Sequence, residues 1–197
     1  IRQFSKNIRI LNIKVYRPKK LDKLISIKTP FFTSNCNAAN NVRDITFIYN
    51  NKIIETPIFV RDRYFENTLL YDIFNEIYDN GKNTQWIKSP NVFLTKNTID
   101  LDDWKKDRDF LNIPKTMQMA IDGHIFKIGK DVIVNIATYN HYLGLNWIKS
   151  FFPKSHFHIV KIADNHIDGS LLCLKPGVFL VHPKIINELK KQLPKKF

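Results

Sequence analysis

The chain has 197 residues, of which 31 are Lys or Arg and 18 are Asp or Glu, so its formal net charge at pH 7 is +13. Hydrophobic residues make up 44% of the chain and aromatic residues 13%, which excludes a protein that is disordered for lack of a core. No run of about 18 uncharged apolar residues occurs, which excludes a membrane-spanning helix.

The first predicted unit lies near residues 44–89. β-branched and aromatic residues form two runs around Asn50-Asn51, which is typical of a hairpin. Apolar residues then recur every four positions from Phe65 to Ile77, and Gly81 follows, which predicts an amphipathic helix with a glycine stop. The unit has the order strand, strand, helix, strand, at residues 45–49, 52–56, about 64–78 and about 86–87.

The same order is predicted a second time near residues 120–163 and begins a third time near residues 170–193. The second unit has its elements at about 125–127, 132–136, 139–152 and 157–162. The third unit has strands at 171–174 and 178–181 and helical positions at 185–189, and it lacks a closing strand. Repetition of one ββαβ unit implies a ring or propeller. We expect a single domain over residues 1–197 that is a fragment of the whole ring.

Two segments stand outside this repeat. Residues 97–116 are polar and charged and are expected to form an insertion, in which Asp102 or Asp103 caps a helix ahead of Trp104 rather than binding a metal. The N-terminal forty residues show no pattern that assigns them to a strand, a helix or a repeat unit.

Charge and cysteine content bear on partners and location. The lysines follow no recognisable nucleic-acid motif, so we interpret the positive charge as a solvated surface and expect neither a nucleic-acid nor a membrane partner. Cys36 and Cys173 are too few for a disulfide scaffold, which favours a reducing compartment such as the cytoplasm.

A candidate site follows the last strand of the second unit. His166 and Asp168 are separated by one residue, in a loop of the kind that carries function on α/β scaffolds. An imidazole and a carboxylate in one cleft can protonate a leaving amine and hold a cation. The motif alone is weak, because most histidines are structural or lie on the surface.

Longer stretches of sequence resemble the glycine amidinotransferase family, the arginine:X amidinotransferases of the pentein superfamily. The stretches occur in the family's order and cover about three quarters of the chain. They are NVRDITFIYNNKIIETPIFVRDRYFE at 41–66, IFKIGKDVIVN at 125–135, NHYLGLNWIKSFFP at 140–153 and HIDGSLLCLKPGVFLVHP at 166–183.

The resemblance implies an α/β fold, a pentein-type propeller of five ββαβ modules that is incomplete in this chain. It also implies an enzyme in which a cysteine attacks the guanidinium carbon of arginine and ornithine leaves. The amidino group then passes to an acceptor amine, while a histidine handles the protons. No cofactor or metal is implied, and the partners are arginine and an amine such as glycine, an aminocyclitol or a small metabolic amine. A homodimer is compatible with the resemblance.

Four residues take roles from this resemblance. His166 matches the family's general acid and base, and Asp122 corresponds, through a one-residue gap, to the acidic partner of that histidine. Asp44 and Asp168 match carboxylates that contact the substrate guanidinium. Read from the residues alone, Asp44 and Asp122 would be turn carboxylates.

The chain also departs from the family pattern. The family nucleophile lies beyond the last residue here, and neither Cys36 nor Cys173 occupies its place, so we expect this chain alone to be inactive. Lys184 stands where the family tends to have an arginine, which leaves recognition of the substrate carboxylate open. The alternatives are a guanidine-modifying hydrolase or deiminase of the same fold and a non-catalytic pentein-like binding module.

Overall fold

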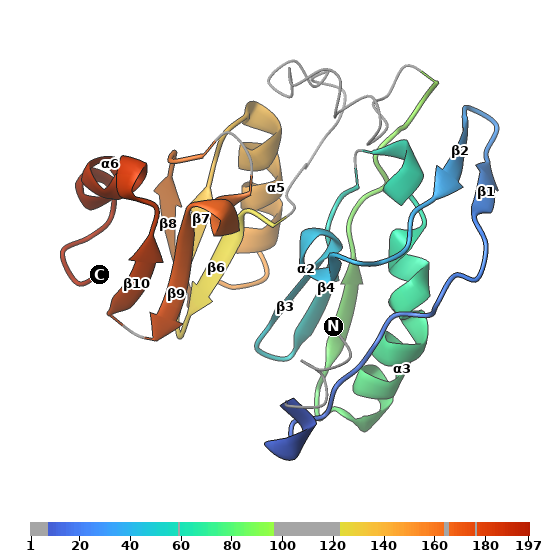
Figure 1. The fold of residues 1–197 in the computed structure, drawn as a ribbon, viewed down its shortest axis with the longest axis horizontal. Helices are drawn as coiled ribbons and strands as arrows, with labels where there is room; N and C mark the ends of the chain where they lie inside the picture. The colour runs from blue at the N-terminus through green and yellow to red at the C-terminus, as the bar shows by residue number, and fades with distance from the viewer. Residues whose placement is uncertain (1–7, 59, 97–122, 164–165, 176) are drawn as a thin grey trace.

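The computed structural model describes residues 8–58, 60–96, 123–163, 166–175 and 177–197. Figure 1 shows two halves side by side, with β1 to β5 and α3 in one half and β6 to β10 with α5 and α6 in the other. Within these described ranges no helix is both long and apolar enough to cross a membrane.

The first module contains β3 (Thr46–Tyr49), β4 (Lys52–Glu55), α3 (Tyr71–Asn80) and β5 (Gln85–Lys88). β3 and β4 pair in antiparallel fashion around a turn in which Asn50 has a positive φ, and β5 pairs with β4 in parallel. The apolar face of α3 packs on this sheet, with Phe74 among the fully buried side chains. The strand, strand, helix, strand order predicted from the sequence is therefore present.

The helix of this module begins later than its apolar periodicity predicts. Residues Arg61–Arg63 and Glu66–Leu70 form 3₁₀ turns, and α3 starts only at Tyr71. The Thr68 hydroxyl donates to the carbonyl of Phe65 at 2.6 Å, a local bond of the kind that competes with regular helix. The expected strand start at Ile45 is likewise replaced by a short helical turn, α2 (Val42–Ile45).

The second module repeats this topology. Strands β6 (Ile125–Ile128) and β7 (Asp131–Asn135) are antiparallel, and β8 (His156–Val160) pairs with β7 in parallel after α5 (Tyr139–Lys149). The helix starts where the sequence predicts it and ends three residues earlier.

A third group continues the pattern at the C-terminal end of the chain. It consists of an antiparallel pair, β9 (Leu171–Lys175) and β10 (Val178–Val181), followed by α6 (Ile186–Gln192). Its apolar residues Leu171 and Leu189 share a core with Ile133 and Val160 of the second module. The described strands form separate sheets of two or three strands and do not close into a barrel.

The N-terminal region, unassigned from the sequence, contains the hairpin of β1 (Ile25–Lys28) and β2 (Thr33–Cys36). It buries Ile27, Phe32 and Cys36 in a small core with residues that flank the first module.

The first and second modules are packed against each other through a shared apolar core. Phe47 and Tyr49 of β3 contact the ring of Phe152, with ring centroids 5.8 and 5.0 Å apart. The Tyr49 hydroxyl donates to the carbonyl of Gly129 at 2.6 Å. This packing places α2 beside Gly123, which lies two residues before β6 at the candidate site.

Candidate active site

Asp44 lies in α2, immediately before β3, and only 6% of its surface is exposed. The turn is held in place by Thr56, whose amide donates to the carbonyl of Ile45 at 3.0 Å and whose hydroxyl donates to the carbonyl of Asp44 at 3.3 Å. A carboxylate this buried needs partners.

One of those partners is Arg63. Its Nη1 lies 3.2 Å from Oδ2 of Asp44, and its Nη2 lies 3.3 Å from Oε1 of Glu66, which its Nε also contacts through Oε2. Arg63 and Glu66 are themselves buried. Burial raises the pKa of Glu66, and the hydrogen bond and charge of Arg63 oppose that rise. Two buried carboxylates thus share one guanidinium.

The other oxygen of Asp44 faces His166. Oδ1 of Asp44 lies 3.6 Å from Nδ1 of His166, which directly precedes the 3₁₀ turn Ile167–Gly169. The His166 side chain remains 26% exposed, so its ring is open to solvent while one edge faces a carboxylate. This arrangement can orient an imidazole and stabilise its protonated form.

Gly123 lies between these two groups. Its φ is +50°, and a Cβ at this position would come within 3.0 Å of both Asp44 Oδ1 and His166 Nδ1. A residue with a side chain would therefore be strained and would push the carboxylate and the imidazole apart.

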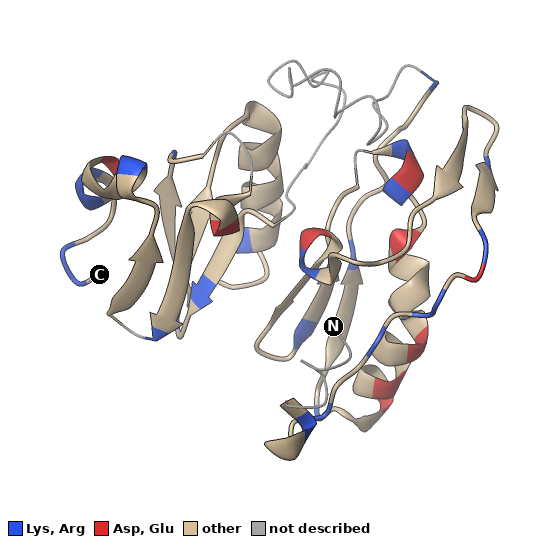
Figure 2. Cartoon of the chain, in the orientation of Figure 1, with Lys and Arg blue, Asp and Glu red and all other residues tan. Residues whose placement is uncertain are grey.

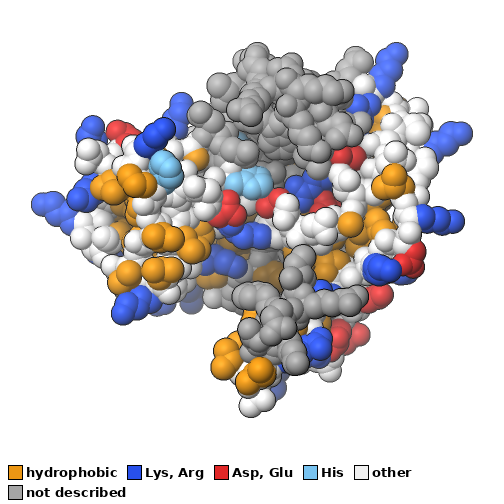
Figure 3. Space-filling view, in the orientation of Figure 1, with side chains coloured by type: hydrophobic (Ala, Val, Ile, Leu, Met, Phe, Trp, Pro, Cys, Tyr) orange, Lys and Arg blue, Asp and Glu red, His pale blue; other side chains and the backbone are white. Residues whose placement is uncertain are grey.

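Asp168 lies at the same edge of the site and forms an ion pair with Arg43. The Nη2 of Arg43 donates to the carbonyl of Gly123 at 2.8 Å, and its guanidinium carbon lies 4.9 Å from the centroid of the Phe126 ring. Arg43 thus connects α2 to the start of the second module and to the turn that precedes β9. The carboxylate of Asp168 already accepts a guanidinium in this geometry. Figure 3 shows acidic, basic and histidine side chains gathered around a hollow between the halves.

Buried polar side chains support the site from the second module. Asn135 accepts the amides of Ile162 and Ala163 at its Oδ1, so its Nδ2 is the donor toward Nδ1 of His124, 3.3 Å away. The ring of His124 packs against His141 and His166, with centroids 4.0 and 5.6 Å apart.

His141 completes the cap of α5. Its amide donates to the Thr138 hydroxyl at 3.3 Å, and its Nδ1 accepts the Thr138 amide at 3.2 Å. The hydrogen-bond pattern therefore leaves Nδ1 of both His124 and His141 without a proton.

The structure brings together three of the four residues predicted from the sequence: Asp44, His166 and Asp168. Asp122, the fourth, lies outside the described residues, as does the acidic segment 97–116. Sequence reasoning missed Arg43, Arg63 and Glu66, although all three lie within the stretch 41–66 that carries the resemblance.

Both cysteines are free. Cys36 is buried in the N-terminal core, and burial raises the pKa of its thiol, which disfavours the thiolate. Cys173, expected as a small core residue, is half-buried on β9, where its Sγ lies 3.4 Å from the carbonyl of Lys175. Among the described residues, no group of three or more His, Cys, Asp or Glu side chains could hold a metal ion.

Comparison with known proteins identifies relatives whose names describe them as amidinotransferases. The chain is 24% identical to L-arginine:L-lysine amidinotransferase of Pseudomonas savastanoi pv. phaseolicola over 195 residues, covering 95% of this chain and 53% of that protein. It is 27% identical to the mitochondrial glycine amidinotransferase of Gallus gallus over 187 residues, covering 86% of this chain and 43% of that protein. No protein-family profile matches.

Solved structures give the same result for the fold. An amidinotransferase of the saxitoxin biosynthetic pathway of Microseira wollei superposes with a TM-score of 0.77 and 26% identity, covering 98% of this chain and 58% of that one. The inosamine-phosphate amidinotransferase of Streptomyces griseus superposes with a TM-score of 0.75 and 22% identity, covering 98% and 54%. The fold is therefore of the pentein type seen in these amidinotransferases, and the chain spans about half the length of the relatives it matches.

Proposed function

We propose that the protein transfers the amidino group of arginine to an acceptor amine, a proposal supported by the similarity of the chain to amidinotransferases in sequence and fold. One observation carries the proposal. An imidazole, a buried carboxylate and a second carboxylate that already binds a guanidinium meet around Gly123. These are the groups that arginine cleavage needs on the protein side, apart from the nucleophile.

In the proposed reaction, a thiolate forms a bond to the guanidinium carbon of arginine, and the bond from that carbon to the side-chain nitrogen of ornithine breaks. His166 gives its proton to the departing amine. The acceptor amine then attacks the same carbon and loses a proton to His166, and the carbon–sulfur bond breaks. The first step leaves His166 neutral, which is the form that accepts the proton of the acceptor amine. The second step returns the proton to His166 and frees the thiolate for the next arginine.

Asp168 is proposed to bind the guanidinium of arginine, because a carboxylate accepts this planar cation through two parallel hydrogen bonds. Arginine would then compete with Arg43 for Asp168. We propose that Asp44 serves His166 through Oδ1 and contributes negative charge toward the substrate, and that Asp122 is a further acidic partner of the histidine.

The thiolate is proposed to come from outside this chain. Cys36 is buried in the N-terminal core with a raised pKa, and Cys173 lies on β9, so neither has the environment of an activated nucleophile. We therefore expect residues 1–197 alone to release no ornithine from arginine. Ornithine release together with an amidino group on either cysteine, detected by mass spectrometry, would contradict this assignment.

The activity itself is tested on the chain together with the polypeptide that supplies the thiol. The protein is incubated with arginine and a panel of amines, including glycine, lysine and an aminocyclitol, and ornithine and amidinated amine are quantified. Ornithine that appears only with an amine, in equal amount to the amidinated product, supports transfer. Citrulline or urea formed without an amine would instead assign a deiminase or a hydrolase.

Three coarser features remain proposals. We propose a cytoplasmic location from the free thiols, to be checked by cell fractionation, although the named vertebrate relatives are mitochondrial.

We propose a homodimer, to be checked by light scattering. We propose no nucleic-acid role, because Lys and Arg are scattered over both halves in Figure 2, and salt-dependent retention on duplex DNA would contradict this.

A further inference from the structure

A cavity of about 160 Å³ adjoins the candidate active site at the boundary between the first and second modules. Its walls come from α2 and β3 on one side and from the start of β6 on the other. It is lined by Arg43, Thr46, Phe47, Thr56, Gly123, Ile125, Phe126 and Lys127. Arg43 and Gly123 also belong to the surroundings of His166 and Asp168, so the cavity and the site share a wall.

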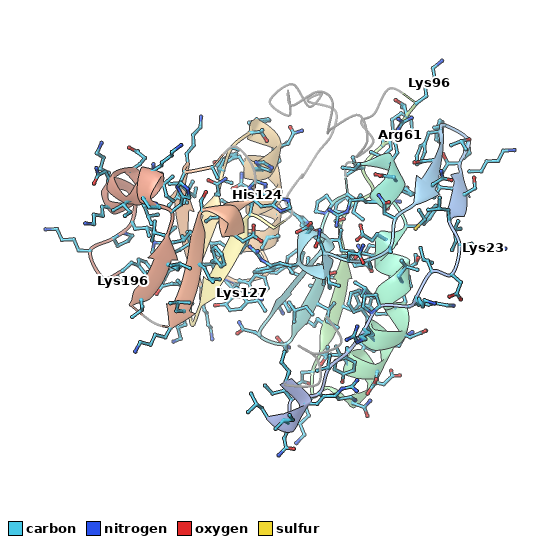
Figure 4. The ribbon with its side chains drawn as sticks, in the orientation of Figure 1. Lys23, Arg61, Lys96, His124, Lys127 and Lys196 are labelled. Atoms are coloured by element: carbon cyan, nitrogen blue, oxygen red, sulfur yellow. The ribbon has the colours of Figure 1, made fainter. Side chains whose placement is uncertain are left out.

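The charges that line this cavity have one sign. Arg43 and Lys127 line it, and no carboxylate does. Figure 4 places Lys127 at the boundary between the halves, below His124. The Nζ of Lys127 donates to the carbonyl of Ile48 at 2.5 Å and lies 5.3 Å from the centroid of the Phe47 ring. No described carboxylate forms an ion pair with this ammonium.

This arrangement is electrostatically unfavourable for a lysine. Desolvation of the ammonium, and after it the charge of Arg43, lower the pKa of Lys127, although the residue as a whole remains exposed. The guanidinium of Arg43 is paired with the carboxylate of Asp168. The ammonium of Lys127 lies beside the carbonyl of Ile48 and the ring of Phe47, and no described carboxylate pairs with it. An anion placed in the cavity would be attracted by both cations and would relieve their mutual repulsion.

We propose that this cavity is a subsite for the oxyanion group of a substrate, a carboxylate or a phosphate, with Lys127 as the binding residue. The proposal rests on the proposed function in that it names the part of the substrate held beside His166. Lys127 supplies two further N–H donors to the anion, and the Phe47 and Phe126 rings form an apolar part of the cavity wall. The cavity admits a carboxylate group together with a few water molecules.

A carboxylate is the occupant that we favour. The cavity shares Arg43 with the surroundings of Asp168, the carboxylate proposed to hold a guanidinium, and amino-acid substrates carry a cationic group and a carboxylate in one molecule. Arg43 is already paired with Asp168, so the charge of Lys127, which no described carboxylate pairs, matches the single charge of a carboxylate. A phosphate carries more charge and is the alternative that the experiment separates.

The direct test uses the chain of residues 1–197 and simple anions, so it does not depend on turnover. Backbone amide resonances of Gly123, Ile125 and Lys127 are followed by NMR during titrations with sodium acetate, inorganic phosphate and sodium chloride at constant ionic strength. We expect saturable shifts with acetate, weaker or equal shifts with phosphate, and no saturable shift with chloride. Saturation by phosphate alone would assign the subsite to phosphate.

Lys127→Met is the informative variant, and Lys130→Met in the β6–β7 turn is its control. Both keep the length of the side chain and remove one charge, but only Lys127 lines the cavity. Loss of one charge-assisted contact should weaken acetate binding about tenfold in Lys127→Met and leave Lys130→Met unchanged. Equal acetate affinity in both variants and the parent chain would overturn the proposal.

A kinetic arm with the active protein identifies which substrate provides the anion. Arginine is compared with agmatine, which lacks the carboxylate, and glycine with methylamine. In Lys127→Met, KM should rise about tenfold for the carboxylate-bearing member of one pair and stay constant for the member that lacks it. An equal change for both members would contradict the subsite. Acetate binding to the chain, together with no turnover of any substrate pair by the protein, would support the subsite and refute the proposed function.

Discussion

The first and second modules have the same strand order, but they connect the second strand to the helix in different ways. In the first module the connection passes through two 3₁₀ turns and carries the buried Arg63 and Glu66. In the second module α5 begins directly at a capping box formed by Thr138 and His141. The first connection supports the site with charges, and the second with uncharged hydrogen-bonding groups.

This difference follows from what each connection supports. The first holds Asp44, a buried carboxylate that requires a cation, and Arg63 supplies it at the cost of burying Glu66 as well. The second holds His124 and His141, whose Nδ1 atoms are satisfied by amide donors. Asp44 and His124, the groups that these connections support, both lie beside His166. Perturbing the charged support should therefore cost more than perturbing the uncharged one.

The largest expected effect concerns the imidazole that both modules support. His166→Ala in the active protein should lower kcat by about 10²- to 10⁴-fold, the usual contribution of a general acid and base. The fold should be retained, because the ring is partly exposed and both supports keep their other partners. Steady-state kinetics and circular dichroism measure the two effects. His156→Ala, at a surface histidine on β8, is the control, and similar losses in both variants would refute the assigned role.

Next in size is the charged support. Arg63→Met should lower the free energy of unfolding by about 3 to 5 kcal/mol, because Asp44 and Glu66 would both lose the buried guanidinium that they share. Urea unfolding of the chain measures this. Arg61→Met, in the same 3₁₀ turn but donating to the carbonyl of Lys96 near the surface, should cost less than about 1 kcal/mol. Equal costs for the two variants would show that the first module does not depend on buried charge.

These residues also show where sequence analysis succeeds and where it ends. The module order follows from local periodicity, and it is present in the structure for that reason. Arg63 and Glu66 look like solvated surface charges in the sequence, since only the fold reveals that Asp44 faces them. The apolar spacing predicts a start for α3 that is too early. The spacing continues through the 3₁₀ turn Glu66–Leu70, whose backbone hydrogen bonds span three residues instead of four. The β1–β2 hairpin escaped notice because its strands are short and polar, with exposed Ile25 and buried Cys36.

The uncharged support should respond more weakly. Thr138→Ala removes the side-chain half of the α5 capping box and should lower the free energy of unfolding by about 1 kcal/mol. Thr68→Ala is the matched control in the first module, because its hydroxyl bonds locally to Phe65 on an exposed turn. That control should stay within about 0.5 kcal/mol of the parent. A loss from Thr138→Ala as large as that from Arg63→Met would reverse the comparison between the modules.

The smallest effect concerns the first residue of the middle strand, which is Lys52 in the first module and Asp131 in the second. Asp131 lies 2.7 Å from Nζ of Lys196 and 2.6 Å from Nε2 of His158. The hydrogen bonds from Lys196 and then His158 lower the pKa of Asp131 below its usual 3.8. A carboxyl whose pKa is lower in the folded state contributes stability above its unfolded pKa and loses it as the pH falls through the folded pKa.

Asp131→Asn should therefore destabilise the chain at pH 7 by less than about 1 kcal/mol, because Lys196 is half exposed and solvent screens the pair. Urea unfolding at several pH values measures the difference between variant and parent. That difference should shrink as the pH falls below 3.8 and should also shrink in high salt. Lys52→Met should show no such pH dependence, since the Lys52 ammonium donates to the uncharged side chain of Gln85. A difference that grows on acidification would mean that Asp131 is held in its neutral form, the opposite of the arrangement described here.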